Sequence, residues 1–326
     1  MARIQLSLAI DQYDHTREIT SGQIPVEGVE LVPVNLPIEE IFFRMAKFHE
    51  FDISELSMGK YIAMRSQGDT TFTALPVFVS RAFRHSSYYV KSGGPIRHPE
   101  QLAGKRVGIP EWAQTASVYS RGMLVHEFGV PLASVEWVQA GVNEAGRVEK
   151  VDRKLPEGVR YRPEPTRCLN DMLMAGEIDC VLSARPPKAL GDGVERLFPD
   201  YQPLEEAYYR KTGIYPIMHS IVVKTALLEA HPWLAMNLFK AFDEARRRSM
   251  SRMDDITASK APLAWLKAYS DHMKSIFGAD FFPYGLEQNR KTLEAFLQYG
   301  FEQGVCFRKL SPEELFPRQV LASFKV

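Results

Sequence analysis

The sequence is poor in cysteine and carries no excess of either charge. Its 326 residues include three cysteines, Cys168, Cys180 and Cys306, which show no metal-ligand spacing. Such a sparse, odd set argues against a disulfide framework and favours reduced thiols that pack as small apolar side chains. Forty basic residues balance forty acidic ones. A neutral chain gives no reason to expect nucleic acid or an anionic membrane as the main partner.

Long apolar runs are also lacking. The N-terminal segment MARIQLSLAI holds only a short apolar run, and Asp11 and Asp14 interrupt the next few residues. A secretory signal needs a longer apolar stretch and a small-residue cleavage site. No later window approaches the roughly 20 apolar residues that a membrane-spanning helix requires. We therefore expect a cytoplasmic protein that does not cross a membrane, and a homo-oligomer is compatible with the sequence.

Common cofactor and nucleophile motifs are absent as well. The sequence contains no GxxxxGK[ST] loop, no GxGxxG fingerprint, no GxSxG elbow and no HExxH helix. Its eight histidines are scattered along the chain. We expect neither a metal nor an organic cofactor. A metal ion assembled from distant ligands, for instance His15 with Glu55, stays open as an alternative.

The sequence does contain an alternation of strand and helix patterns. In the first part, apolar alternation predicts strands at residues 3–10, 29–34, 51–56 and 72–78, and helical spacing predicts helices at 37–48 and 58–65. A second unit comes next, with strands predicted at 105–109, 135–138 and 179–183 and helices at 115–128 and 167–175. Residues 149–165 are polar and contain prolines, which predicts mostly loop. A strand at 217–223 returns to the first unit, and the rest is helical. This order predicts an α/β protein built on largely parallel sheets.

Two segments resemble a known family. PEQLAGKRVGIPEWAQTASVYSRGML, residues 99–124, resembles the start of the second lobe in type 2 solute-binding proteins. FFPYGLEQNRKTLEAFLQYGFEQGV, residues 281–305, and the later SPEELF resemble the 4,5-dihydroxyphthalate decarboxylase family. The similarity extends over essentially the whole chain and includes the opening LSLAIDQYDHT. The C-terminal block, residues 281–305, identifies relatives but not the substrate, since its pattern indicates a role in packing.

The resemblance implies a two-lobed, type 2 periplasmic-binding-protein-like fold with a ligand cleft between the lobes. We expect residues 1–88 and 208–326 to form the first lobe and 89–207 the second, with hinge segments near 84–89 and 208–219. The implied activity is non-oxidative decarboxylation of 4,5-dihydroxyphthalate to 3,4-dihydroxybenzoate, without a cofactor. Two alternatives stay open, because one fold serves many functions. One is a non-catalytic solute-binding protein for an aromatic acid, and the other is a cytoplasmic enzyme acting on a different carboxylate.

Such a reaction sets clear demands on the site. Loss of CO2 from an aryl ring is difficult unless the ring carbon is protonated first, and a deprotonated hydroxyl para to that carbon can supply the electrons. The site therefore needs a proton donor, a base for the phenol, cations or backbone N–H groups for the retained carboxylate, and an apolar patch.

Five residues are candidates for proton transfer. His15 lies in the loop after the first strand, Glu55 at the end of another strand, and Glu111 in a polar turn before a helix. His85 and His219 lie on the hinge segments. For each histidine a structural role, at the surface or in the core, is the competing interpretation.

Eight further residues are candidates for substrate binding. Arginine offers a planar fork for a carboxylate, while hydroxyl groups at a helix N-terminus favour an anion. Competing interpretations are helix capping for the hydroxyls, packing for the aromatic residues and solvated or ion-paired roles for the arginines. The candidates are Ser57, Arg81, Arg84, Trp112, Thr115, Ser117, Arg185 and Tyr215.

Overall fold

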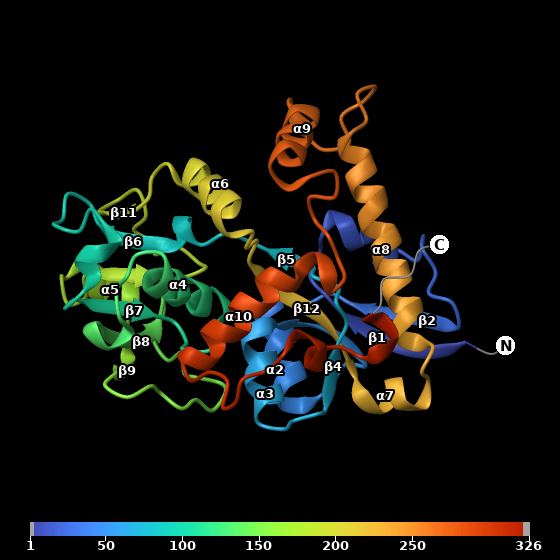
Figure 1. Ribbon diagram of the computed structural model, residues 1–326, viewed down its shortest axis with the longest axis horizontal. Coiled ribbons are helices and arrows are strands. Elements are labelled where there is room, and N and C mark those ends of the chain that lie inside the picture. The colour runs from blue at the N-terminus through green and yellow to red at the C-terminus, as the bar shows by residue number, and fades with distance from the viewer. Residues whose placement is uncertain (1–2, 322–326) are drawn as a thin grey trace.

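The protein consists of two lobes. The computed structural model describes residues 3–321. Each lobe is built around one six-stranded sheet with helices packed against it, and the lobes lie side by side along the long axis of the molecule (Figure 1). This is the α/β architecture that the alternation of patterns predicts.

The sheet of the first lobe combines parallel and antiparallel strands. Its strands are β1 (Ile4–Ala9), β2 (Val29–Val34), β3 (Ile53–Ser57), β4 (Phe72–Ala74), β5 (Ser80–Arg81) and β12 (Ile217–Lys224). The strand order is β2–β1–β3–β12–β4, with β5 paired to β12. As predicted, β2, β1 and β3 run parallel. Strand β12 runs antiparallel to its neighbours because it enters this sheet from the other lobe.

The second sheet lies at the other end of the molecule. Its strands are β6 (Tyr88–Lys91), β7 (Arg106–Ile109), β8 (Glu136–Gly141), β9 (Arg160–Cys168), β10 (Cys180–Leu182) and β11 (Val194–Arg196). The strand order is β11–β6–β10–β7–β8–β9. The four strands from β10 to β9 are parallel, and β6 pairs antiparallel with both β10 and β11. Helices α4 (Thr115–His126) and α5 (Leu169–Met174) accompany this sheet.

Strand β9 corrects one prediction. Its polar, proline-bearing sequence led us to expect mostly loop over residues 149–165 and a helix from 167, whereas the strand continues to Cys168 and α5 begins at Leu169. In the described part of the chain the strand pairs with β8 alone and forms the edge of the sheet. An edge strand tolerates proline, because one row of its backbone groups has no partner strand.

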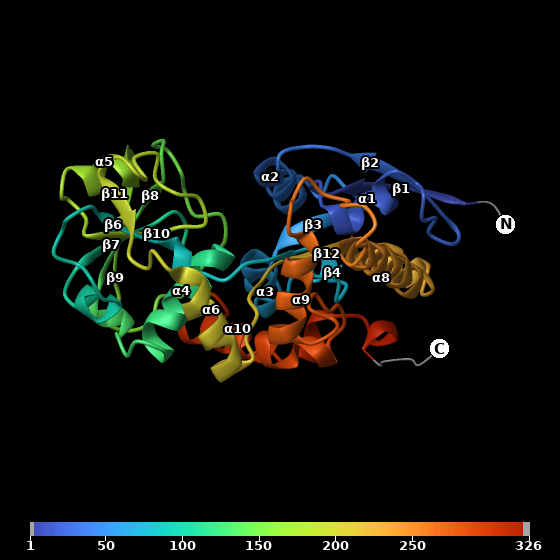
Figure 2. The ribbon, with the colours of Figure 1, turned by 90° about the horizontal axis from the view of Figure 1, so that it is seen from above.

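Two chain segments connect the lobes. The first runs from β5 to β6, and the second from α6 (Tyr201–Thr212) into β12. Figure 2 shows these connections between the separated bodies of the two lobes. They support the boundaries that we propose, residues 1–88 with 208–326 for the first lobe and 89–207 for the second.

The remaining helices cover the first lobe and reach toward the second. They are α1 (Arg17–Thr20), α2 (Ile38–Phe48), α3 (Met58–Ser66), α7 (Thr225–Ala230), α8 (Leu234–Met253), α9 (Leu266–Phe277) and α10 (Arg290–Glu302). Helix α10 packs against both α3 and α4. Just after it, the Gln303 carbonyl accepts a hydrogen bond of 2.8 Å from the Trp112 indole, and its side-chain amide donates to the Val118 carbonyl at 2.9 Å. The C-terminal region therefore braces one lobe against the other.

Burial characterises the central strands and the inward helix faces. All five residues of β3 are buried, as befits a strand at the centre of a sheet. In α2 the buried side chains are Ile41, Phe42 and Met45, which share one face at helical spacing. The three cysteines are buried free thiols, as predicted. Across residues 3–321, no helix is both long and apolar enough to span a membrane.

Candidate active site

A cavity of about 140 Å³ lies between the lobes. Both lobes contribute to its walls, which combine apolar residues with an unusual number of charged ones. The first lobe supplies the start of α2, the junction of β3 and α3, and part of β12, while the second supplies the turn before α4 and two loops. The lining residues are Ile38, Glu39, Phe42, Ser57, Lys60, Arg84, Glu111, Gln114, Thr115, Ala116, Arg147, Lys150, Ala184, Arg185, Met218 and His219.

A histidine–carboxylate pair forms one wall. Antiparallel pairing places His219 of β12 opposite Ser57 of β3, so Glu55 is its diagonal neighbour on the sheet. Nδ1 of His219 lies 2.6 Å from Oε1 of Glu55. The Glu55 side chain is fully buried, whereas that of His219 is 20% exposed toward the cavity. Such a pair fixes the ring orientation and favours a proton on Nδ1, which leaves Nε2 free to act as a base.

Further hydrogen bonds hold Glu55 in place. The Tyr13 hydroxyl donates to Oε1 at 2.6 Å, and the backbone N–H of Asp11 donates to Oε2 at 3.1 Å. Burial and the neighbouring Glu55 carboxylate raise the pKa of Tyr13, so its hydroxyl remains a donor. Within residues 3–321, Nε2 of His219 forms no hydrogen bond. The loop after β1 therefore serves to position the pair.

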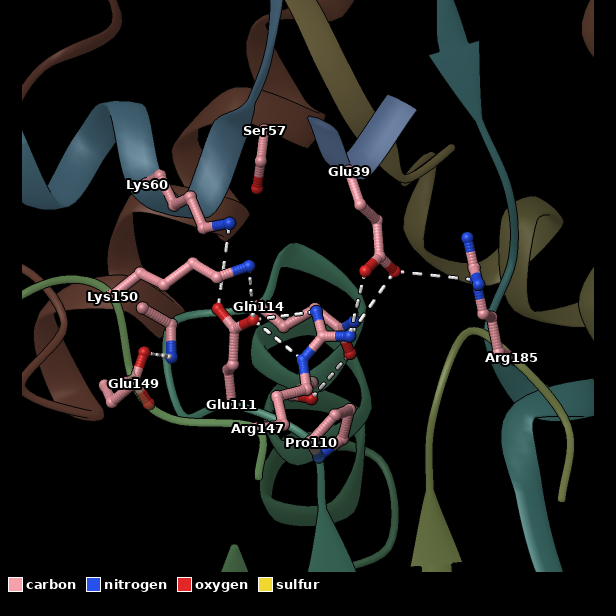
Figure 3. A network of polar contacts seen from close by, with 12 residues as sticks. Glu39, Ser57, Lys60, Pro110, Glu111, Gln114, Arg147, Glu149, Lys150 and Arg185 are labelled. Atoms are coloured by element: carbon pink, nitrogen blue, oxygen red, sulfur yellow. Dashed lines mark hydrogen bonds and ion pairs between the residues drawn. The ribbon is translucent and has the colours of Figure 1, made fainter. Parts of the chain in front are cut away.

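The opposite wall is a network of charges around Glu111 (Figure 3). Glu111 follows β7 in the turn before α4 and is fully buried. Its Oε1 accepts from Arg147 Nε at 2.8 Å and lies 3.3 Å from Lys150 Nζ. Its Oε2 lies 3.7 Å from Nζ of Lys60, which enters from the first lobe. Three cations thus surround one carboxylate.

These charges change the acidity of the groups. Burial alone would raise the pKa of Glu111, but Lys60, Arg147 and Lys150 hold it below its usual value. Glu111 is therefore ionised. Burial lowers the pKa of Lys60, and Glu111 compensates only in part.

Local backbone contacts place Arg147 and Glu111 in this network. The Gln139 side chain donates to the carbonyls of Pro110 and Arg147, both at 2.8 Å, and so ties the loop after β8 to the turn after β7. Gly141 ends β8, and a Cβ atom there would lie 1.9 Å from the Glu144 carbonyl oxygen. Only glycine permits so tight a turn at this point.

Glu39, at the start of α2, links the lobes across the cavity mouth. Its carboxylate lies 3.2 Å from Nη1 of Arg147 and 3.5 Å from Nε of Arg185, both from the second lobe. Figure 3 shows Glu39 pointing between the two arginines. A carboxylate of the protein itself thus occupies a position that suits the carboxylate of a ligand.

Arg84 differs from the other cations of the cavity because it forms no ion pair within residues 3–321. It lies on the segment that connects the lobes, is 9% exposed and lines the cavity. Its guanidinium contacts the Met218 sulfur, and its buried Nε has no hydrogen-bond partner among the residues that the structure describes. Burial lowers its pKa to about 10, so it remains charged near neutral pH. A buried cation without an acidic partner is costly and is typical of a site for an anionic ligand.

The N-termini of α3 and α4 meet beside the cavity. The hydroxyls of Ser57 and Thr115 lie 2.8 Å apart, and the backbone N–H of Gly59 donates to the Thr115 hydroxyl at 2.9 Å. A Cβ atom on Gly59 would lie 2.2 Å from the Ala113 carbonyl oxygen. Glycine thus permits this close approach of the lobes, and two helix N-termini favour negative charge nearby.

The structure brings together seven of the residues proposed from the sequence. Ser57, Arg84, Glu111, Thr115, Arg185 and His219 line the cavity. Glu55 lies directly behind His219. Ser57 occupies the N-cap position of α3, but its hydroxyl bonds to Thr115 and caps no backbone N–H group of α3.

Three of the other predicted residues are built into the protein interior. The indole of Trp112 is fully buried under the Arg121 guanidinium, 3.9 Å from its ring centroid. Ser117 is fully buried in α4 and donates to Gln114. His85 is 3% exposed and packs edge-on against Phe198 and Tyr208. None of these three lines the cavity.

Arg81, Tyr215 and His15 also lie outside the cavity lining. Arg81 donates to the backbone carbonyls of Tyr215 and Pro283, at 3.2 Å and 2.7 Å. The Tyr215 ring stacks on Phe83. Nε2 of His15 lies 3.1 Å from the Val79 carbonyl oxygen, and burial lowers the pKa of His15 to about 4. Within residues 3–321, no group of three or more His, Cys, Asp or Glu side chains is arranged to hold a metal ion.

Five of the polar residues that line the cavity were not proposed from the sequence. They are Glu39, Lys60, Gln114, Arg147 and Lys150. Lys60 could have been predicted from its spacing, because it follows Ser57 by three residues and so lies on the same face of the helix. Arg147 and Lys150 lie in an irregular loop, where spacing carries no information about direction.

Two decarboxylases are similar to this chain, although no family model matches it. It is 38% identical to the 4,5-dihydroxyphthalate decarboxylase of Comamonas testosteroni over an alignment of 330 positions, which covers all of both chains. It is 37% identical to the enzyme of the same name from Pseudomonas putida over 214 residues, 64% of this chain and 83% of that protein.

Solved structures confirm the fold that the sequence resemblance implied. The periplasmic aliphatic sulphonate binding protein SsuA of Escherichia coli superposes with a TM-score of 0.55 at 12% identity, over 98% of this chain and 99% of that one. The desulfurization enzyme DszB superposes with a TM-score of 0.53 at 15% identity, over 98% of each chain. At these identities the likeness establishes the periplasmic-binding-protein-like fold alone.

Proposed function

Because this chain belongs to the 4,5-dihydroxyphthalate decarboxylase family, we propose that it converts 4,5-dihydroxyphthalate to 3,4-dihydroxybenzoate and CO2. The reaction is non-oxidative, since a carbon–hydrogen bond replaces the bond to one carboxylate. The alternative of a non-catalytic binding protein is supported only by the shared fold, which many functions use.

In this proposal His219 is the base. Its Nε2 takes the proton of the hydroxyl para to the departing carboxylate, and Glu55 stabilises the imidazolium that forms. The resulting oxyanion pushes electrons toward the ring carbon that bears the leaving group. The substrate thus supplies its own electrons, and the pair His219–Glu55 starts their movement.

The retained carboxylate binds to Arg84. A guanidinium offers paired N–H donors to a carboxylate, and this one forms no ion pair within residues 3–321. The N-termini of α3 and α4 add favourable electrostatic potential. The ring lies against the apolar part of the lining, formed by Ile38, Phe42 and Met218.

The size of the cavity bears on how the substrate enters. Its volume of about 140 Å³ is similar to the roughly 150 Å³ of a cavity that admits benzene. A benzene ring with two carboxylates and two hydroxyls is larger. We infer that a substrate carboxylate displaces Glu39 from Arg147 and Arg185, so that α2 and the second lobe move slightly apart.

The observation that carries the proposal is the presence, in one cavity, of a carboxylate-oriented histidine and a buried arginine without an acidic partner among residues 3–321. The test is incubation of purified protein with 4,5-dihydroxyphthalate, followed by chromatography for 3,4-dihydroxybenzoate. Phthalate, which lacks the hydroxyls, is the control and should not turn over. Tight binding of 4,5-dihydroxyphthalate without any product would favour the binding-protein alternative.

We also propose that the protein works in the cytoplasm. Its three cysteines are free thiols, and free thiols persist in reducing compartments. Fractionation of cells that express the full-length protein would test this location.

A further inference from the structure

The cavity holds a second group suited to proton transfer. We propose that Lys60 is the proton donor to the ring carbon that loses CO2. This inference rests on the proposed decarboxylase function and adds the catalytic acid that the reaction requires.

The position of Lys60 is a consequence of the local fold. Strand β3 passes directly into α3, so Lys60 lies in the first turn of the helix, at the edge of the cavity. Its side chain is 6% exposed. A lysine this well buried is rare without a function or a tight partner.

Lys60 and His219 border the same aromatic ring. Nζ of Lys60 lies 5.6 Å from the centroid of Phe42, and the imidazole of His219 lies 4.8 Å from it, centroid to centroid. A substrate ring packed against Phe42 therefore has an acid and a base within reach of its atoms. The reaction needs this arrangement, because the phenol and the protonated carbon lie at opposite ends of the substrate ring.

The ammonium group is held loosely. Its acidic partner, Oε2 of Glu111, lies 3.7 Å away, beyond hydrogen-bond distance. That oxygen is buried and accepts no hydrogen bond within residues 3–321. Glu111 is instead engaged through Oε1 with Arg147 and Lys150. Lys60 can therefore turn toward a substrate without breaking a strong contact.

The other charged groups of the cavity suit the task less well. Glu111 is ionised, since the cations around it lower its pKa. Arg147 and Arg185 are engaged with Glu111 and Glu39, and Arg84 is assigned to the retained carboxylate. Lys150 is 28% exposed and lies closer to Glu111 than Lys60 does. Burial lowers the pKa of Lys60, which makes its ammonium the stronger acid.

The step balances in atoms and charge. His219 removes the phenolic proton, and Lys60 gives its proton to the ring carbon as electrons move in from the oxyanion. The bond to the carboxylate then breaks, its electron pair returns through the ring to the oxygen, and CO2 leaves. His219 returns its proton to that oxygen, and neutral Lys60 takes a proton from solvent. One proton is consumed for each CO2 released.

The test uses Lys60→Ala and Lys60→Arg in the full-length protein, with Lys47→Ala as the matched control. Lys47 lies on the exposed side of α2, outside the cavity lining. We expect kcat to fall about 100-fold or more in both Lys60 variants, because arginine keeps the charge but not the acidity. Binding of 3,4-dihydroxybenzoate, measured by calorimetry, should persist in Lys60→Arg and would show that this variant is folded.

Chemical rescue provides the decisive readout. Small primary ammonium ions should restore turnover to Lys60→Ala, with rate constants that depend on the pKa of the amine, while tetramethylammonium should not. Retention of more than about a tenth of the wild-type kcat in either variant, or the absence of rescue by any amine, would overturn the role of Lys60. Absence of turnover in the wild type would instead count against the proposed function itself.

Discussion

Nδ1 of His219 lies 2.6 Å from Oε1 of Glu55, across the boundary between two antiparallel strands. The carboxylate is fully buried and receives two further hydrogen bonds, from the Tyr13 hydroxyl and the Asp11 backbone. The position of Glu55 is therefore set by its own strand β3, by β12 and by the loop after β1. The second ring nitrogen of His219, Nε2, is available in the cavity, which is the basis of its proposed role.

Replacing Glu55 with Gln should damage catalysis more than binding. An amide keeps the shape but cannot stabilise the imidazolium, so we expect kcat to fall roughly 100-fold or more with a small change in KM. Steady-state kinetics would measure both constants. Tyr13→Phe is the matched control, because it removes one hydrogen bond to Glu55 and leaves the carboxylate, and its loss should be about tenfold or less. Equal falls in the two variants would contradict a special role for the charge.

Replacing Arg84 with Met should weaken binding and stabilise the fold. Loss of charge-assisted hydrogen bonds to a carboxylate costs about 1.5–3 kcal/mol, so KM should rise roughly 10- to 100-fold. The same change removes a buried cation that has no acidic partner within residues 3–321, and the free energy of unfolding should increase by about 1 kcal/mol or more. Kinetics and urea unfolding would check the two effects. An unchanged KM would show that the carboxylate binds elsewhere.

Replacing Glu39 with Gln should improve apparent affinity. Glu39 competes with the substrate for Arg147 and Arg185, and a partly exposed ion pair is worth up to about 1 kcal/mol. We therefore expect KM to fall about two- to fivefold. Glu40→Gln is the control, because Glu40 pairs with Arg44 on the same helix. An increase in KM for Glu39→Gln would mean that Glu39 helps to bind the substrate.

Acid should destabilise the protein through His85. Burial lowers the pKa of His85 from 6.5 to about 4, so between these values the unfolded chain binds a proton that the folded protein resists. Stability is therefore lost as the pH falls through this window, by roughly 3 kcal/mol for this residue. Nearby Glu205 acts in the opposite direction, because burial raises its pKa to about 7.

The effect of His85 can be isolated with His85→Phe, which keeps a ring beside Phe198 and Tyr208. Urea unfolding of the variant and the wild type at about pH 7 and about pH 4.5, near the two ends of this window, would give the difference in stability at each pH. We expect the free energy of unfolding of the variant, relative to that of the wild type, to be higher at the lower pH than at the higher one. A difference that does not change with pH would show that His85 is not the titrating group.

The architecture could be predicted well from the sequence, and the candidate site in part. Periodicity placed Glu55, Ser57 and Arg185 at or just after strand ends, and the family resemblance implied a cleft beside those ends. The pairing of His219 with Glu55 could not, because it depends on the register between β12 and β3. The two residues are 164 positions apart in the sequence, and no local pattern encodes a register over that separation.

Packing decided the other assignments. Trp112 and His85 were candidates for ligand contact, yet both rings are buried in the interior. Large rings contribute most to the stability of the fold when they are buried. Arg147 and Lys150 reach Glu111 from an irregular loop whose path is set by Gln139 and Gly141. Side-chain direction in such a loop emerges only from tertiary contacts.

The most direct test of the proposed activity is the reaction of the wild-type protein with 4,5-dihydroxyphthalate in D2O, followed by proton NMR. We predict 3,4-dihydroxybenzoate with a single deuterium at the ring position that the carboxylate has left. Such a product would show both that CO2 is lost and that a solvent-exchangeable proton is delivered to that carbon. No product after prolonged incubation of folded protein would contradict the assignment of this cavity as a decarboxylase active site.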